Sequence, residues 1–206
     1  MNPFISIWTQ PKKTLAYLIE HKTIGYGLMI MVISSLGSGI MAFADIGLLD
    51  GFSWATILAI SLGTSLLISI PAYFISAFVY AWIGKILGGT GNWRQMCLVI
   101  AGGALPMIMV VPIEILAVLI YGKGLFAEPV GVYAVTNMSF GFYLFYTVLL
   151  IGLSIFSAVI QSKGVGLVHN FSAWRGFGTI MIYAGIVFVL SFILIIITVG
   201  GILFMV

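Results

Sequence analysis

The chain has 206 residues, of which 62% are apolar and 6% charged, and its formal net charge at pH 7 is +3. Because soluble domains carry about 25% charged and about 45–50% apolar residues, this composition excludes a soluble globular domain. Uninterrupted apolar runs of about 20 residues fit membrane-spanning helices, and the short polar–apolar alternation of a β-barrel does not occur. The sequence therefore predicts an all-α, polytopic integral membrane helical bundle forming one membrane domain, residues 1–206.

The N-terminal segment, residues 1–23, has the pattern of an amphipathic helix at the membrane surface. Its apolar residues recur at helical spacing, and Pro11 suits the first turn of a helix. We expect Trp8 to lie at headgroup depth and Lys12 and Lys13 to face anionic lipid. The alternative is a partly disordered leader.

Five apolar spans follow, and we predict them at residues 24–44, 56–83, 96–121, 137–160 and 177–206. All lysines and arginines except Lys123 fall on the side of the membrane that holds the N-terminus. The positive-inside rule then predicts the N-terminus inside and the C-terminus outside. A small-residue cleavage pattern at Ala42-Phe43-Ala44 follows an apolar run too long for a signal peptide, so we expect the first span to be retained.

Small residues at four-residue spacing predict close contacts between helices. They occur in three of the spans, at Ser35 and Gly39, at Gly102 and Gly103, and at Gly152. These contacts lie within the chain or, alternatively, in a homo-oligomer or with another membrane protein. The tyrosines in or near the spans, such as Tyr73 and Tyr146, are expected to make hydrogen bonds between helices or to lie in the aromatic belts.

Glu114 is the single acidic residue inside an apolar span, in the outer third of the third span. A charged acid at the centre of a membrane helix costs about 2.5–3.5 kcal/mol on insertion scales. Pro106 and Pro112 remove backbone hydrogen bonds nearby, and the freed carbonyls with the carboxyl group predict a candidate polar pocket or ion site. Alternatively, Glu114 reaches the interface and pairs with Lys123.

Two similar cytoplasmic turns form a second candidate region. Each ends in a Trp-Arg pair where the chain re-enters the membrane, Trp93-Arg94 and Trp174-Arg175. The likeness suggests two parallel helical hairpins, or a chance recurrence of residues that favour interfaces. With Lys12, Lys13 and His169, these pairs are our candidates for contact with lipid or a partner.

No residue is predicted to be catalytic, and no cofactor or metal is expected. The sequence has no HExxH, CxxC or serine-nucleophile pattern. Cys97, the single cysteine, cannot form an intrachain disulfide and is expected to be a small buried side chain. Because the basic residues lie at membrane edges, no nucleic-acid partner is expected either.

Three segments together resemble the Yip (Ypt-interacting protein) family in its short bacterial form. They are an N-terminal leader with Asn2-Pro3-Phe4 and Gln10-Pro11, the stretch from the Gly88-Gly89 turn to Pro106, and residues 164–175. In the last, Asn170 stands where the family has glycine. The resemblance covers nearly the whole chain and implies five spans with the N-terminus inside. Eukaryotic relatives bind Rab-type GTPases and have a long cytosolic N-terminal region that we do not find here, so GTPase binding is not carried over.

These observations lead to two hypotheses of different kinds. The first is a non-enzymatic protein of the bacterial cytoplasmic membrane that organises or scaffolds it through membrane lipids or a partner on the cytoplasmic face. The alternative is a transporter or permeation pathway for a lipid or small solute, with the proline-broken third span and Glu114 forming the path.

Overall fold

The computed structural model describes residues 1–131 and 134–203, with side chains as far as Thr198. Every regular element in this part of the chain is helical, and some elements are short 3₁₀ segments (η). In chain order they are α1 (Pro3–Thr9), α2 (Pro11–His21), α3 (Ile24–Met41), α4 (Trp54–Ile86), α5 (Trp93–Ala104), η1 (Leu105–Val110), α6 (Val111–Tyr121), η2 (Gly122–Phe126), α7 (Phe140–His169) and α8 (Ala173–Leu203).

Five segments are long and apolar enough to cross a membrane, which confirms the predicted fold class. They are α3, α4, the α5–η2 segment, α7 and α8. Residues 204–206, the end of the fifth predicted span, lie outside the described residues.

The helices α4 and α7 continue past the predicted limits of 83 and 160, to Ile86 and His169. Each ends just before a residue with positive φ, at Gly88 (φ 85°) and Asn170 (φ 56°, ψ 38°). The left-handed conformation stops an α-helix, and asparagine tolerates it best after glycine. This explains how Asn170 occupies a position where the family has glycine.

The N-terminal segment forms two helices rather than the single interfacial helix that we predicted. The chain changes direction at Gln10, and Pro11 begins α2. Leu15 and Leu18 of α2 are buried, and a Cβ added at Gly102 on α5 would overlap the Leu15 side chain. Part of the apolar face therefore packs on the bundle, because α5 offers a smooth small-residue surface there.

The third span is interrupted, as its prolines suggested. The α-helical α5 ends at Ala104, the 3₁₀ segment η1 follows, and α6 begins at Val111. Pro106 lies in the first turn of η1 and Pro112 in the first turn of α6, where a missing N–H leaves no hydrogen bond unmade. By contrast, α4 runs through Pro71 without a break.

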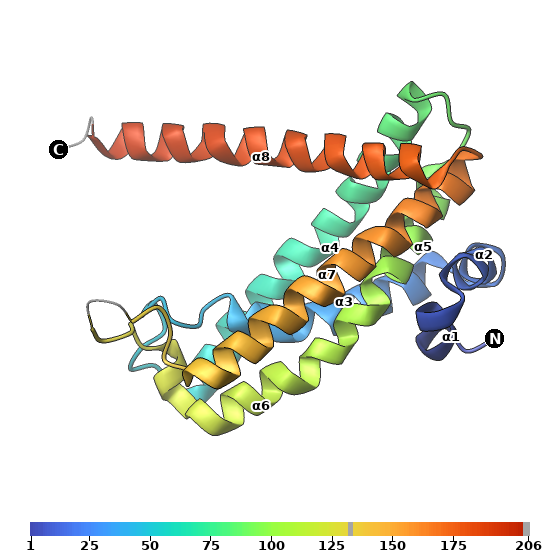
Figure 1. Ribbon diagram of the computed structural model, residues 1–206. Helices are drawn as coiled ribbons and strands as arrows, with labels where there is room; N and C mark the ends of the chain where they lie inside the picture. The colour runs from blue at the N-terminus through green and yellow to red at the C-terminus, as the bar shows by residue number, and fades with distance from the viewer. Residues whose placement is uncertain (132–133, 204–206) are drawn as a thin grey trace.

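The helix α5 is the centre of the bundle, since all its residues from Met96 to Ala104 are buried. Figure 1 shows one end of the bundle formed by α1, α2, the end of α7 and the start of α8, and loops at the opposite end. The helix α8 contacts the bundle through its first part, where the hydroxyls of Tyr183 and Ser76 are hydrogen-bonded at 2.6 Å. From Ala184 to Thr198 every side chain of α8 is exposed. The helix diverges there from α7 (Figure 1).

Candidate functional site

A cavity of about 520 Å³ lies between α3, the α5–η1–α6 segment and α7. Its polar lining comes from Ser34, Ser35 and Ser38 of α3, Gln161 and Ser157 of α7, and the pair Glu114 and Tyr146. The rest of the lining is apolar, including Met31, Met41 and Met107. Of the residues predicted for a polar pocket, Glu114 lines this cavity and Pro106 and Pro112 do not. We call it the Glu114 cavity.

The carboxyl group of Glu114 is buried at 3% exposure. Its Oε1 accepts a hydrogen bond of 3.0 Å from the hydroxyl of Tyr146 on α7. On the other side it packs against Gly37 of α3, where an added Cβ would overlap the carboxyl group. Lys123 is exposed on η2 and forms no ion pair with Glu114 in the described structure. The geometry therefore places Glu114 in the cavity rather than at the interface.

The two prolines place Glu114 by setting the start of α6. Because α6 begins at Val111, Glu114 falls in its first turn. Neither Pro106 nor Pro112 supplies a ligand group, so their role in this cavity is positional.

The three α3 serines present acceptors to the Glu114 cavity, whereas Gln161 and Ser157 carry both acceptors and donors. The hydroxyls of Ser34, Ser35 and Ser38 donate to carbonyls of their own helix at 2.9–3.1 Å, which leaves their lone pairs free. Gln161 accepts from Tyr80 at 3.5 Å through Oε1. The Oγ of Ser157, at 6% exposure, has no hydrogen-bond partner in the described part of the chain.

A second concave surface lies at the end of the bundle that holds α2. It has a volume of about 690 Å³, and Lys12, Lys13 and Lys163 line it together with apolar side chains. An adjoining recess of about 320 Å³ shares Lys163 and carries Trp174 and Phe177. We call the two together the basic groove. No acidic residue lines either part.

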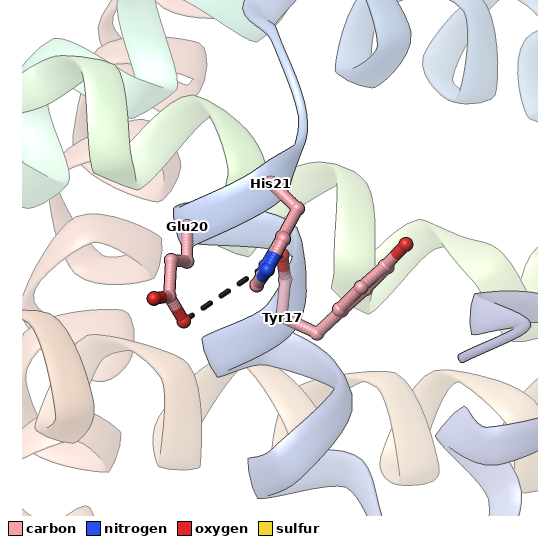
Figure 2. A network of polar contacts seen from close by, with 3 residues as sticks. All are labelled: Tyr17, Glu20 and His21. Carbon is pink, nitrogen blue, oxygen red and sulfur yellow. Dashed lines mark hydrogen bonds and ion pairs between the residues drawn. The ribbon is translucent and has the colours of Figure 1, made fainter.

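The acidic residue of α2 lies away from this groove. Glu20 is near the C-terminal end of α2, whereas Lys12 and Lys13 are in its first turn. Figure 2 shows Glu20 beside His21, with Oε2 of Glu20 3.8 Å from Nδ1 of His21. The imidazole of His21 also stacks on the Tyr17 ring, with ring centroids 4.6 Å apart. Among residues 1–131 and 134–203 the contact between Glu20 and His21 is the one with ion-pair geometry, and it is an ion pair when the imidazole is protonated. The groove lysines therefore keep their charge free for another anion.

The remaining predicted interface residues separate into two groups. Trp174, 82% exposed, belongs to the basic groove, and Arg175 follows it at the exposed start of α8. Trp93 and Arg94 are exposed at the start of α5, with the guanidinium 5.8 Å from the indole centre. They do not line the basic groove.

His169 is buried at 1% exposure, so it does not face lipid or a partner as an interface residue would. Its Nδ1 accepts a hydrogen bond of 3.1 Å from the N–H of Gly91. The imidazole also stacks on Phe171, 5.4 Å away, and lies against Gly84 and Gly89. His169 thus joins the α4–α5 turn to the end of α7.

Sequence reasoning missed Lys163 as a groove residue, although it counted that lysine as cytoplasmic. It also missed Gly37, and it did not identify Ser157 or Gln161 as cavity residues. The spacing of residues in α7 did contain a signal. Ser157 and Gln161 follow Tyr146 by eleven and fifteen residues, and at 3.6 residues per turn these spacings place all three side chains on one face of the helix. Nothing in the sequence indicated which helix that face contacts.

The predicted close helix contacts are found within the chain at several positions. An added Cβ would meet Ser65 at Gly39, Leu15 at Gly102 and Gln161 at Gly103, whereas Gly152 faces open space. Tyrosine hydroxyls also link helices as expected, since Tyr73 donates to the carbonyl of Cys97 at 2.9 Å.

Comparison with known proteins gives one result. The Yip1 domain matches residues 5–197, so the chain belongs to the Yip family. No curated protein and no solved structure matches it.

Proposed function

We propose that this member of the Yip family is a non-enzymatic protein of the bacterial cytoplasmic membrane that organises or scaffolds the membrane by binding anionic lipid on its cytoplasmic face. The observation that carries the proposal is the basic groove. Lys12 and Lys13 from α2 and Lys163 from α7 line one concave surface, and no acidic residue is among the described residues that line it.

The groove has the two parts that a phospholipid needs. The three ammonium groups suit a phosphate and an anionic headgroup, and each lysine near an anionic surface contributes about 1 kcal/mol. The adjoining recess, with Trp174 and Phe177, suits acyl chains at the membrane boundary. Lys163 belongs to both parts and joins them.

The position of two lysines also favours an external anion. Lys12 and Lys13 lie in the first turn of α2, where the helix dipole disfavours positive charge. The two lysines therefore do not stabilise α2, and another interaction must favour positive charge at this position. A phosphate at this position would interact favourably with both lysines and with the helix start.

The orientation belongs to the same proposal. The structure groups α2, the end of α7 and the start of α8 at one end of the bundle, and these carry Lys12, Lys13, Lys163 and Arg175. The positive-inside rule places such an end in the cytoplasm. The N-terminus would then be inside and the far end of α8 outside.

Native mass spectrometry of gently extracted protein tests the proposal. We expect retained phosphatidylglycerol in preference to phosphatidylcholine, and a several-fold loss of this preference in a Lys12→Ala/Lys13→Ala/Lys163→Ala variant. Lys85→Ala is the control for charge loss, because Lys85 is exposed at the end of α4 outside the groove. Equal retention of the two lipids by the wild-type protein would contradict the proposal.

The same spectra report whether the chain is a monomer, a homo-oligomer or bound to another membrane protein. The exposed part of α8 from Ala184 to Thr198, apolar except for Ser191 and Thr198, is a surface available for such contacts. A scaffold that acts through self-association predicts a lipid-dependent oligomer.

A second candidate function, passage of a lipid or small solute, is favoured by the Glu114 cavity. The cavity lies beside a span that is interrupted at η1, as many transport pathways are. Flux of fluorescent lipid in reconstituted vesicles tests it. Wild-type protein without flux above protein-free vesicles would exclude it.

A further inference from the structure

We propose that the Glu114 cavity binds an ammonium group carried on an apolar chain. The inference concerns the interior of the bundle and does not depend on lipid binding at the basic groove. Glu114 would bind the ammonium group, and the apolar part of the lining would bind the chain.

The first observation is the acidic group in the cavity. Glu114 contributes a carboxyl group at 3% exposure, and among the described residues no lysine, arginine or histidine forms an ion pair with it. Its Oε1 is bonded to Tyr146, whereas Oε2 has no hydrogen-bond partner in the described structure. A buried carboxylate with a free oxygen favours a positively charged partner that can donate to it.

The other polar groups that line the cavity also favour a ligand with hydrogen-bond donors. The α3 serines present lone pairs, since their hydrogens are used within the helix. The buried Oγ of Ser157 lines the same cavity and has no partner among the described residues. An alkylammonium has three donors and no acceptor, so it matches this acceptor-rich surface.

The shape of the cavity selects a ligand with a long apolar part. Tyr146 and Ser157 lie eleven residues apart on α7, or about 16 Å at 1.5 Å per residue. Between them the lining is mostly apolar, with Leu150 of α7 and Met31 and Met107 from the facing segments. Methionine side chains adapt to flexible apolar ligands. The volume of about 520 Å³ is within the range of small-molecule sites.

Other ligand classes fit less well. A hard divalent cation takes six or more oxygens with several carboxylates, and Glu114 is the one acid in the lining. An anion would meet the carboxylate without a compensating cation. A neutral chain would not supply Oε2, which lies against Gly37, with the donor that an ammonium group carries.

The ligand could come from the bilayer or from solution. Ser38 and Ala42, which line the cavity on α3, are exposed, so the cavity opens at the surface of the bundle. An aminophospholipid would enter through this opening with its headgroup amine, and a soluble hydrophobic amine could use the same route. Both share the ammonium group and the apolar chain.

The test uses the full chain in phosphatidylcholine nanodiscs, with protein-free nanodiscs subtracted. The probe is dodecylamine, and its neutral counterparts are dodecanol and N-acetyldodecylamine. We expect saturable, one-to-one binding of dodecylamine by calorimetry, at least tenfold tighter than either neutral compound. Equal binding of the neutral compounds to the wild-type protein would overturn the inference, and this comparison needs no variant.

Variants then locate the site. Glu114→Gln keeps the shape of the side chain and should weaken dodecylamine binding at least tenfold. Glu128→Gln is the control, because Glu128 lies in the loop after η2 and outside the cavity. Retention of full affinity by Glu114→Gln would overturn the proposal.

Competition by phosphatidylethanolamine in the nanodisc identifies the source. Displacement of dodecylamine assigns the site to an aminophospholipid, and lack of displacement assigns it to a soluble amine. Both results support binding of an ammonium group. Because the nanodiscs contain no anionic lipid, failure of this test leaves the basic groove unaffected, and the groove variants leave this test unaffected.

Discussion

The hydroxyl of Tyr146 on α7 donates a hydrogen bond of 3.0 Å to Oε1 of Glu114 on α6. This bond joins two spans across the Glu114 cavity. In the described structure, Tyr146 is the hydrogen-bond donor found for the Glu114 carboxyl group. Its loss would leave a buried acid without a partner, which is costly in a membrane interior.

Tyr146→Phe should therefore lower stability, by about 1–3 kcal/mol for a buried acceptor left unpaired. The measurement is the unfolding midpoint in a fixed detergent. Tyr143→Phe is the matched control, because the Tyr143 side chain is 36% exposed and no hydrogen bond of its hydroxyl is found in the described structure. Equal midpoints for the two variants would show that the bond contributes nothing.

Gly37→Ala should displace Glu114, because the added methyl group would overlap its carboxyl group. Overpacking of this kind costs typically about 1–3 kcal/mol. The same substitution at Gly63 on α4 is the control, since nothing lies within 4 Å of a Cβ there. Gly63→Ala should be neutral or slightly stabilising through its helix propensity. If Gly37→Ala is as stable as Gly63→Ala, the packing described for Glu114 is incorrect.

His169→Ala should loosen the contact between the α4–α5 turn and the end of α7. It removes the acceptor of the Gly91 N–H and leaves a void among Gly84 and Gly89. The expected cost is about 2 kcal/mol or more, from a lost hydrogen bond and a cavity. Limited proteolysis at residues 87–92 should accelerate.

His21→Ala is the control for this variant, since the His21 side chain is 52% exposed on α2. Unchanged proteolysis of the α4–α5 turn in His169→Ala would contradict the role assigned to His169.

Asn170→Gly should leave stability within a few tenths of a kcal/mol, because glycine adopts the observed φ of 56° without strain. Asn170→Ala should cost about 1 kcal/mol or more, from the left-handed backbone conformation. Both variants lose the hydrogen bond of Nδ2 to Thr90, so their difference in unfolding midpoint isolates the backbone effect. Equal unfolding midpoints for Asn170→Gly and Asn170→Ala would mean that the left-handed backbone conformation at residue 170 does not affect stability.

Much of the fold follows from local sequence, and much of the two sites does not. Long apolar runs predicted the five spans, since each run meets the length that a bilayer requires. Pro106 and Pro112 likewise marked the interruption at η1 in the third span. These features depend on residues close together in the chain.

The pairing of helices depends on surfaces far apart in the sequence, which no local pattern encodes. The docking of Leu15 against Gly102, the meeting of Lys163 with Lys12, and the burial of His169 among turn glycines are of this kind. For the same reason Glu114 could be recognised as unusual, but its partner Tyr146 could not be chosen among several tyrosines.

The most direct test of the account locates the anionic lipid on the chain. A phosphatidylglycerol carrying a photoreactive group near its headgroup would be cross-linked to the reconstituted protein, and the modified peptides identified by mass spectrometry. We expect cross-links concentrated in residues 10–16 and 159–177, which contain the residues that line the basic groove. Excess unlabelled phosphatidylglycerol should remove them, and excess phosphatidylcholine should not. Cross-links spread evenly around the bundle, or concentrated at Trp93 and Arg94, would contradict the account.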